Sequence, residues 1–173
     1  MRKQLNYQLN EQDMLDFNLF YTFNTPSLTF SRNMNKYAYS LAVAVLGVAL
    51  VTLLNLPNFI AFGIVMIGFL RIVLFNWDLE RKLKRSIKRR VESGGLVLDT
   101  KNSVRFDADC FVVGIGKETS VNKYSDIEHV AVGKNGLYLF MNSKHAHILP
   151  RRIFEGDAEF DETVDFINGR VRA

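Results

Sequence analysis

A long apolar run, interrupted once, constrains this chain more than any other feature of its sequence. Residues 37–77 are rich in Leu, Val, Ile and Phe, and Arg71 is the one charged residue among them. A helix needs about 20 predominantly apolar residues to cross the hydrocarbon layer of a bilayer. The run is about twice that long, and an Asn-Leu-Pro-Asn sequence at residues 55–58 divides it near its middle. We therefore predict two membrane crossings, over about 37–56 and 58–77.

The composition of both segments favours insertion. Residues 41–54 contain nine Leu or Val, and residues 58–77 contain twelve Phe, Ile, Val or Leu. Each such residue contributes roughly −0.3 to −0.6 kcal/mol, which gives about −3 to −5 and about −4 to −7 kcal/mol for the two segments. Arg71 costs about 3 kcal/mol at most, and less near the end of a span, where its side chain reaches the headgroups. Both segments are therefore expected to insert.

Basic residues flank this helical hairpin at its two outer ends. Arg32 and Lys36 precede the first span, seven Lys or Arg follow the second, and the connecting turn carries no charge. Lys and Arg are enriched on the cytoplasmic side of membrane proteins. Tyr37 and Trp77 fall at the same expected interface, where aromatic residues are common. The sequence therefore predicts a multi-pass protein of the cytoplasmic membrane with both termini in the cytoplasm.

The seven cations after the second span lie in residues 78–94, which we expect to continue the span as a basic juxtamembrane helix. An apolar residue recurs in it every four positions, at Leu79, Leu83, Ile87 and Val91, which is typical of one helical face. The cations are Arg81, Lys82, Lys84, Arg85, Lys88, Arg89 and Arg90. They serve either to bind anionic lipid headgroups or only to fix the topology, and the sequence leaves both interpretations open.

The rest of the chain has room for one small domain. About 40 of the 173 residues are assigned to the membrane, and the remainder is enough for a single small core.

Cys110 is the only cysteine, so an intrachain disulfide is impossible and no oxidising compartment is indicated. The first 36 residues show no early apolar core and no small-residue cleavage site, so we expect no signal peptide.

Residues 95–173 change to a pattern of short strands. Turn signals separate six apolar or alternating runs, at residues 96–99, 104–106, 111–115, 127–132, 137–141 and 146–149. The final segment has a helical period, with Phe160, Val164 and Ile167 on one face. We therefore predict an α+β membrane protein, in which a two-helix transmembrane hairpin carries a small antiparallel β barrel or bent sheet capped by a C-terminal helix.

Three stretches of this domain resemble a known family. They are Tyr124-Ser125-Asp126-Ile127, Leu137-Tyr138-Leu139-Phe140 and residues 148–154. Together with residues 9–13, they resemble the YcxB-like family of bacterial membrane proteins. The resemblance implies a polar N-terminal segment, two spans and a domain similar to the pleckstrin-homology (PH) fold, in a bacterial membrane. It implies no activity and no catalytic or ligand-binding residue.

The N-terminal arm, residues 1–36, is expected to be part of the cytoplasmic structure. Apolar residues alternate over residues 5–9, as in a strand with one buried face, and Asn10 with Asp13 is typical of a cap before an amphipathic helix. A domain of about 78 residues has a marginal core on its own. We therefore predict that the arm docks on the C-terminal domain, adding a strand or covering an edge.

Side chains that carry chemistry are sparse. His145 and His147 alternate on one predicted strand without a third ligand at a useful spacing, and Ala146 and Ile148 on the opposite face indicate that the histidines point to solvent. The run at residues 114–117 lacks the spacing of a phosphate-binding loop. We therefore expect no enzyme, no cofactor and no metal site. Nucleic acid is not an expected partner, because the densest cations adjoin the bilayer.

The sequence predicts a non-catalytic, membrane-anchored protein that presents a PH-like domain to a protein partner or to a second copy of itself. One alternative is a sensor of anionic lipid headgroups, which would use the seven cations together with Arg151 and Arg152. Another is a component of an oligomeric transporter, for which Arg71 is the one intramembrane charge. Neither the partner nor the oligomeric state follows from the sequence.

Overall fold

The computed structural model describes residues 4–96, 98, 100–142 and 145–171. It divides into two compact units. The domain unit consists of Met1–Asn18 and Ser86–Ala173, and the hairpin unit consists of Leu19–Arg85.

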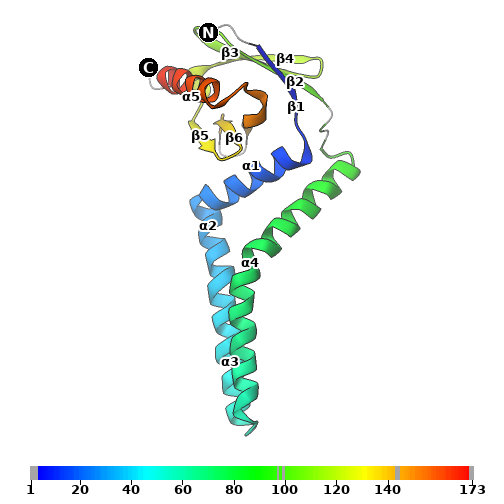
Figure 1. Cartoon of the computed structure of the whole chain (residues 1–173), viewed down its shortest axis with the longest axis vertical. Coiled ribbons are helices and arrows are strands. Elements are labelled where there is room, and N and C mark those ends of the chain that lie inside the picture. The colour runs from blue at the N-terminus through cyan, green and yellow to red at the C-terminus, as the bar shows by residue number, and fades with distance from the viewer. Residues whose placement is uncertain (1–3, 97, 99, 143–144, 172–173) are drawn as a thin grey trace. The chain divides into compact units, whose positions relative to one another are not determined.

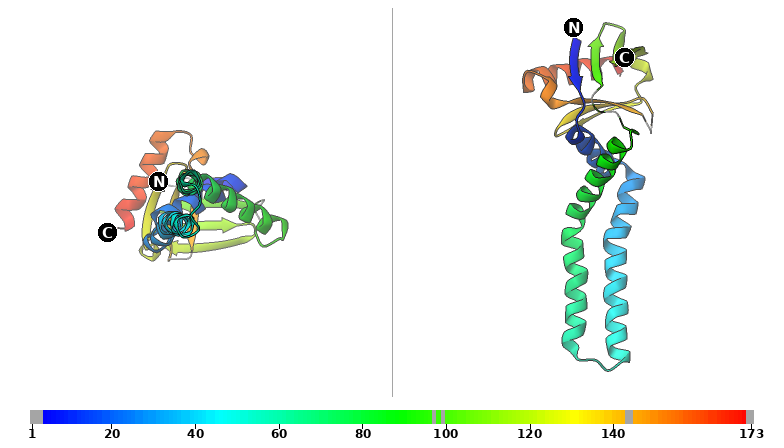
Figure 2. Two further views of the ribbon diagram at one scale, coloured as in Figure 1. Left: turned by 90° about the horizontal axis from the view of Figure 1, so that it is seen from below. Right: turned by 90° about the vertical axis from the view of Figure 1, so that its right-hand side faces the viewer.

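The hairpin unit contains two long helices that run antiparallel and are joined by a short turn (Figure 2). The first helix runs from Pro26 to Leu53, and its parts are α2 (Pro26–Asn33), one π-helical turn (Met34–Ala38) and α3 (Tyr39–Leu53). The second is α4 (Asn58–Glu92), whose final residues belong to the domain unit. By length and composition, both helices are candidates for crossing a membrane.

The helix boundaries differ from the prediction at the outer end of the first helix and agree with it at that of the second. The first helix begins at Pro26, well before residue 37, because a proline favours the first helical position and the polar residues after it remain helical. At the other end α4 continues without a break through the basic segment, as predicted. The turn also lies where it was predicted: Asn55 has a φ of 51°, a left-handed conformation that asparagine tolerates.

Two glycines bring the helices of the hairpin into close contact. A Cβ atom on Gly47 would clash with Cγ2 of Ile64, and one on Gly68 would lie 3.3 Å from the backbone oxygen of Ser40. Small residues of this kind let helix backbones approach each other. Gly63, in contrast, has no atom within 4 Å of its Cβ position. The sequence alone did not separate the packed glycines from the open one.

Replacing Gly47 with leucine is expected to push the two helices apart, with a loss of about 1–3 kcal/mol from overpacking. Trp77, the single tryptophan, lies in the hairpin unit. Thermal unfolding in detergent, followed by its fluorescence, should therefore show a lower midpoint. Gly63→Leu is the matched control and should leave the midpoint close to that of the wild type. Equal losses in both variants would contradict this packing.

The domain unit contains, in its described part, seven strands in two antiparallel sheets and a C-terminal helix (Figure 1). Sheet A has the order β1 (Gln4–Gln8), β2 (Lys101–Phe106), β3 (Cys110–Ile115), β4 (Glu118–Lys123). Sheet B has the order β5 (His129–Gly133), β6 (Gly136–Phe140), β7 (Ala146–Pro150). Helix α5 (Asp157–Val171) follows. The structure thus has the α+β composition that the sequence predicts.

Sheet A departs from the prediction in two strands. Strand β4 was missed, because Glu118–Lys123 is almost entirely polar and exposed and shows no apolar alternation. Strand β2 begins at Lys101, where a turn was predicted. The predicted strand at residues 96–99 includes residues 97 and 99, which lie outside the described residues.

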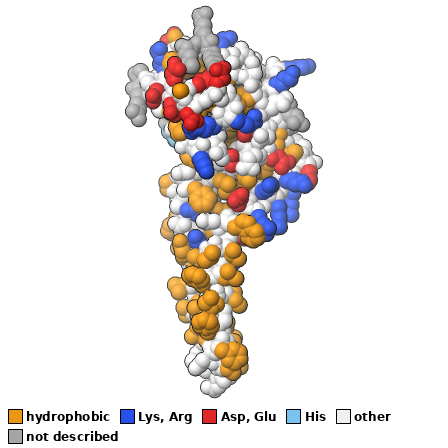
Figure 3. Space-filling view, in the orientation of Figure 1, with side chains coloured by type: hydrophobic (Ala, Val, Ile, Leu, Met, Phe, Trp, Pro, Cys, Tyr) orange, Lys and Arg blue, Asp and Glu red, His pale blue; other side chains and the backbone are white. Residues whose placement is uncertain are grey.

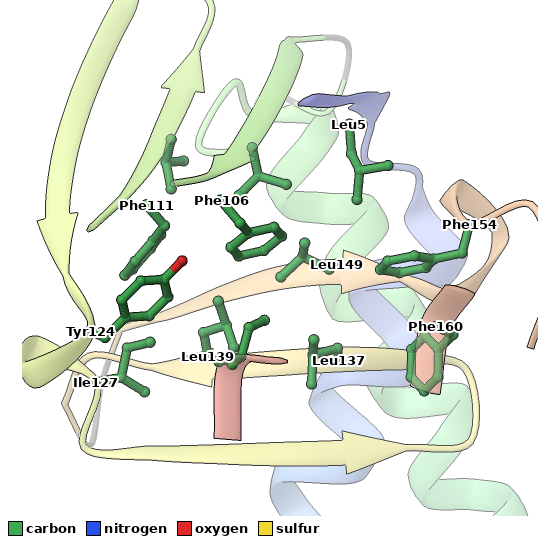
Figure 4. Close-up of a cluster of buried hydrophobic side chains, with 13 residues drawn as sticks. Leu5, Phe106, Phe111, Tyr124, Ile127, Leu137, Leu139, Leu149, Phe154 and Phe160 are labelled. Atoms are coloured by element: carbon green, nitrogen blue, oxygen red, sulfur yellow. The ribbon is translucent and has the colours of Figure 1, made fainter. Parts of the chain in front are cut away.

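Side chains of both sheets and of α5 meet in one core (Figure 4). Phe111 of sheet A and Leu139 and Leu149 of sheet B are fully buried. Phe160 and Ile167 of α5 are also buried, which confirms the predicted apolar face of this helix. The core therefore depends on both sheets and on the helix at once.

The N-terminal arm belongs to this domain up to Asn18. In β1, Leu5 stands opposite Val104 of β2, and its side chain joins the core. Helix α1 (Glu11–Asn24) begins with a reciprocal cap: the Asp13 N–H donates to Oδ1 of Asn10 at 2.8 Å, and the Asn10 N–H donates to Oδ2 of Asp13 at 2.9 Å. The predicted strand and cap are both present.

Helix α1 covers the face of sheet B that points away from the core. The ring of Phe17 lies 5.2 Å from the ring of Tyr138 and 6.1 Å from that of Phe140, centroid to centroid. Asn135 donates to Oδ2 of Asp16 at 2.8 Å beside this contact. All five residues of β6 are buried as a result. The predicted docking of the arm is thus present for the part of it that belongs to the domain unit.

Candidate functional site

Arg152 holds the arm against the domain from a short 3-10 turn, Arg151–Ile153, that follows β7. Its Nη2 donates to Oδ2 of Asp13 at 2.6 Å and to the backbone oxygen of Gln8 at 2.6 Å, and its Nε donates to Oδ1 of Asp13 at 3.2 Å. The planar guanidinium suits this two-pronged contact with a carboxylate. One side chain therefore binds both the strand and the helix of the arm; we call this contact the clamp.

The charges of the clamp compensate each other, with a buried carboxylate and an arginine side chain that is 48% exposed. Asp13 is only 8% exposed. The hydrogen bonds to Asp13 raise the pKa of the Arg152 guanidinium above its ordinary value. Nearby, burial together with the charge of Asp13 raises the pKa of Tyr7 to about 12, so this phenol stays neutral at physiological pH. The positive charge of Arg152 is thus balanced by a carboxylate of the chain.

Arg151 has a similar structural role at the start of α5. Its Nη2 and Nε donate to Oδ1 of Asp157 at 2.9 and 3.1 Å, and its Cζ lies 4.4 Å from the centroid of the Phe160 ring. Asp157 is largely exposed. Both arginines that the sequence suggested for a lipid or partner surface therefore have a carboxylate partner within the chain. No local pattern marks the pair of Arg152 with Asp13, because the two residues are 139 positions apart in the chain.

The other seven predicted cations all lie on the C-terminal part of α4 and are exposed (Figure 3). The predicted apolar stripe is less exposed: Ile87 is buried, and Leu79, Leu83 and Val91 are half-buried. The cations therefore occupy the more open faces of the helix. Residues 78–92 contain seven basic and three acidic residues, a surplus equal to the net charge of +4 of the whole chain.

Few of these cations are neutralised by neighbours on the helix. Lys82 pairs with Asp78 at 2.6 Å, and Lys88 approaches a carboxylate oxygen of Glu92 at 3.9 Å. Both pairs are exposed, and such pairs contribute little to stability. The guanidinium of Arg81 lies 3.4 Å above the ring of Trp77, a cation–π contact. This part of α4 is therefore a strongly basic surface with an aromatic residue at its start.

Arg71 joins the two helices of the hairpin. Its Nη2 donates to Oδ1 of Asn35 at 3.4 Å, and its Cζ lies 4.2 Å from the centroid of the Tyr39 ring. The charge thus has a polar and an aromatic neighbour on the first helix. This arrangement agrees with a residue near the end of a span.

The structure corrects the expected orientation of His147. Its ring makes an edge contact with the ring of the fully buried Phe111, at 6.0 Å between centroids, so it faces the core and is half-buried. His145 precedes β7 and is exposed. The expectation failed because His147 stands opposite the core residue Leu139 of β6, and α1 packs on the other face of sheet B. No group of three or more His, Cys, Asp or Glu side chains suited to a metal ion occurs in the part of the chain that the structure describes.

Burial makes His147 a source of pH-dependent stability. Burial lowers the pKa of the His147 imidazole below its ordinary value of 6.5. As the pH falls through the pKa of the unfolded chain, the unfolded state takes up a proton that the folded state does not bind. Stability should therefore be lost below about pH 6.5, down to the pKa of the folded state. Above this window the imidazole is neutral in both states and contributes no pH dependence.

We expect the thermal midpoint of the wild type to fall more between pH 7.5 and 5.5 than that of His147→Gln. His145→Gln removes an exposed imidazole from the same segment and should behave like the wild type. Circular dichroism of the full chain in detergent measures all three. Parallel pH profiles for the wild type and His147→Gln would refute the assignment.

Residues 104–167 match the model of the family described as YcxB-like protein, so the chain carries a YcxB-like domain in this range. The match runs from β2 into α5 and confirms the resemblance seen in the sequence. The arm and both long helices lie outside the matched range. No curated protein and no solved structure was found to match the chain.

Proposed function

We propose that this chain is a non-catalytic anchor protein that crosses the membrane twice and presents a PH-like domain in the cytoplasm to a protein partner or a second copy. The main observation in support of this proposal is the exposed apolar surface of the hairpin. Among the described residues, 24 exposed large hydrophobic side chains lie between Phe23 and Trp77, and three lie elsewhere. A soluble monomer rarely exposes a contiguous apolar patch beyond a few hundred Å². A surrounding bilayer removes this cost.

The fold of the domain unit supports the topology. Strand β1 comes before the hairpin and β2 after it, yet the two pair along five residues each. A hairpin that crosses twice brings both of these segments to the same side of the membrane, as the pairing requires. The basic residues at the hairpin's outer ends favour the cytoplasm for that side.

The shape of the domain supports a role in interaction. Two antiparallel sheets of four and three strands with a C-terminal helix agree with a PH-like fold. A fold alone does not specify a ligand. Strand β4 ends its sheet, and edge strands offer unpaired backbone groups to another chain. Val121 on β4 is one of the exposed apolar residues of the domain, at 69% exposed, so we assign the partner contact to this edge.

Labelling of single cysteines tests the topology. In a Cys110→Ser background, cysteines at exposed Asn6 and Asp165 should react with a membrane-impermeant maleimide only after the cells are permeabilised. A cysteine at Leu56, in the turn, should react in intact cells. Reaction of the Asn6 and Asp165 positions from opposite sides of the membrane would overturn the proposal.

A photo-crosslinking residue tests the partner surface. Placed at Val121 in intact cells, it should give one recurring adduct, either with a second copy of this chain or with one other protein. The same residue at Glu162, which is exposed on α5, is the control and should not give that adduct. Adducts of equal yield from both positions would rule out the β4 edge as the contact.

A further inference from the structure

We propose that one face of α4, formed by Trp77, Arg81, Lys84, Arg85 and Lys88, binds the headgroups of anionic phospholipids in the membrane that anchors the chain. We call it the headgroup face. The inference rests on the proposed membrane placement and adds a ligand class to it. It also separates α4 from Arg151 and Arg152, which the sequence had grouped with it.

Helix geometry places these five residues on one face of α4. They lie 4, 7, 8 and 11 positions after the first, and at 3.6 residues per turn they fall within an arc of about 100°. All five are exposed. The nearest acidic residues in this stretch, Asp78 and Glu80, fall outside that arc. The headgroup face therefore contains four cations and no acidic residue within its arc.

Position along the helix places the cations near the expected bilayer surface. Trp77 ends the apolar run, and tryptophan is enriched at the level of the headgroups. At 1.5 Å per residue, Arg81 lies about 6 Å and Arg85 about 12 Å beyond it along the axis. Electrostatic attraction to an anionic surface falls off over a Debye length of about 8 Å at physiological ionic strength. Arg81 thus lies within one Debye length of the level of Trp77, and Lys84 and Arg85 lie within two.

A topology signal alone does not require this arrangement. Such a signal depends on the number of cations near a span, in any distribution around the helix. Here four of the seven cations share one face, which begins with an aromatic residue that stacks on Arg81, and the apolar stripe with buried Ile87 lies on another face. Lys82, Arg89 and Arg90 lie outside the headgroup face. Arg151 and Arg152, in contrast, are compensated by Asp157 and Asp13. Of the nine cations that the sequence suggested for a lipid or partner surface, those without a close carboxylate therefore lie on α4.

The single tryptophan provides a direct test, because it lies on the headgroup face itself. The full chain is reconstituted in phosphatidylcholine vesicles that contain phosphatidylglycerol, with bromine on the acyl chains of one lipid species at a time. Bromine quenches tryptophan fluorescence only at close range. At equal mole fraction, brominated phosphatidylglycerol should quench Trp77 at least about threefold more than brominated phosphatidylcholine. Salt at 0.5 M should reduce this ratio.

A triple variant, Lys84→Gln with Arg85→Gln and Lys88→Gln, should lower the quenching ratio measurably below that of the wild type. Arg81 is retained because it stacks on the reporter. The matched control removes three exposed lysines of the domain, with the changes Lys101→Gln, Lys117→Gln and Lys134→Gln, and should keep the wild-type ratio. Equal quenching by both lipids in the wild type, or an unchanged ratio in the triple variant, overturns the inference and leaves the anchor intact. Absence of quenching by either lipid overturns the membrane placement as well.

Discussion

Replacing Arg152 with alanine is expected to release the N-terminal arm and to lower the free energy of unfolding by about 2–3 kcal/mol. The change removes the hydrogen bonds to Gln8 and Asp13. It also leaves the Asp13 carboxylate, which is 8% exposed, without a cation. A buried charge that loses its partner costs more than the pair contributed, because its desolvation is no longer offset.

The neighbouring residue supplies a matched control. Arg151→Ala also removes an arginine–carboxylate pair, but its partner Asp157 is 82% exposed and is readily hydrated when left alone. We expect a loss below about 1 kcal/mol. Thermal unfolding in detergent compares the two variants, and limited proteolysis reports on the arm, which should be cut in Arg152→Ala only. Similar stability losses with an intact arm in both variants would rule out the clamp.

The clamp matters because it closes a domain whose two segments are separated by the hairpin. Strand β1 and the start of α1 come before the hairpin, and the other strands of the domain come after it. A released arm would uncover the face of sheet B on which Phe17 packs. It would also leave β2 as an open edge. Loss of the clamp is therefore expected to affect the surface that the domain presents as well as its stability.

Local signals explain what the sequence predicted correctly. The cap formed by Asn10 and Asp13, the apolar face with Phe160 and Ile167, and the turn at Asn55 each depend on residues a few positions apart. Helix periodicity and turn chemistry are properties of short segments. The docking of the arm was also predicted, from the small size of the remaining core.

Long-range packing explains what the sequence left open. Arg152 contacts Asp13 across 139 positions of the chain, so no local pattern marks the pair. His147 faces the core because a distant helix covers the other side of its sheet. Gly47 and Gly63 look alike in the sequence and differ only in what the neighbouring helix places beside them. Each of these features depends on contacts between distant segments, which the periodicity of a short segment does not predict.

The second large effect is expected for Phe111→Ala, which should cost about 3–5 kcal/mol. Phe111 is fully buried and connects the two sheets. Its ring lies 5.7 Å from that of Tyr124 and 6.0 Å from that of His147 on sheet B. Truncation of this ring leaves a cavity between the two sheets, and the cavity adds to the free energy lost with the ring's contacts. Each kilocalorie is a large share of the stability of a domain this small.

Two valines of sheet A test whether such a loss of stability comes from the core or from any substitution in the sheet. Val113 of β3 is 3% exposed and Val121 of β4 is 69% exposed. Val113→Ala should destabilise the domain measurably, by about 1–3 kcal/mol, and Val121→Ala should change its stability by less than about 0.5 kcal/mol. Thermal unfolding of the full chain in detergent, followed by circular dichroism, ranks the three variants. Because Val121 is exposed on β4, its variant should keep the wild-type fold, whereas Phe111→Ala should unfold much more readily. A Val121 variant as unstable as that of Val113 would contradict the assignment of core and surface to opposite faces of sheet A.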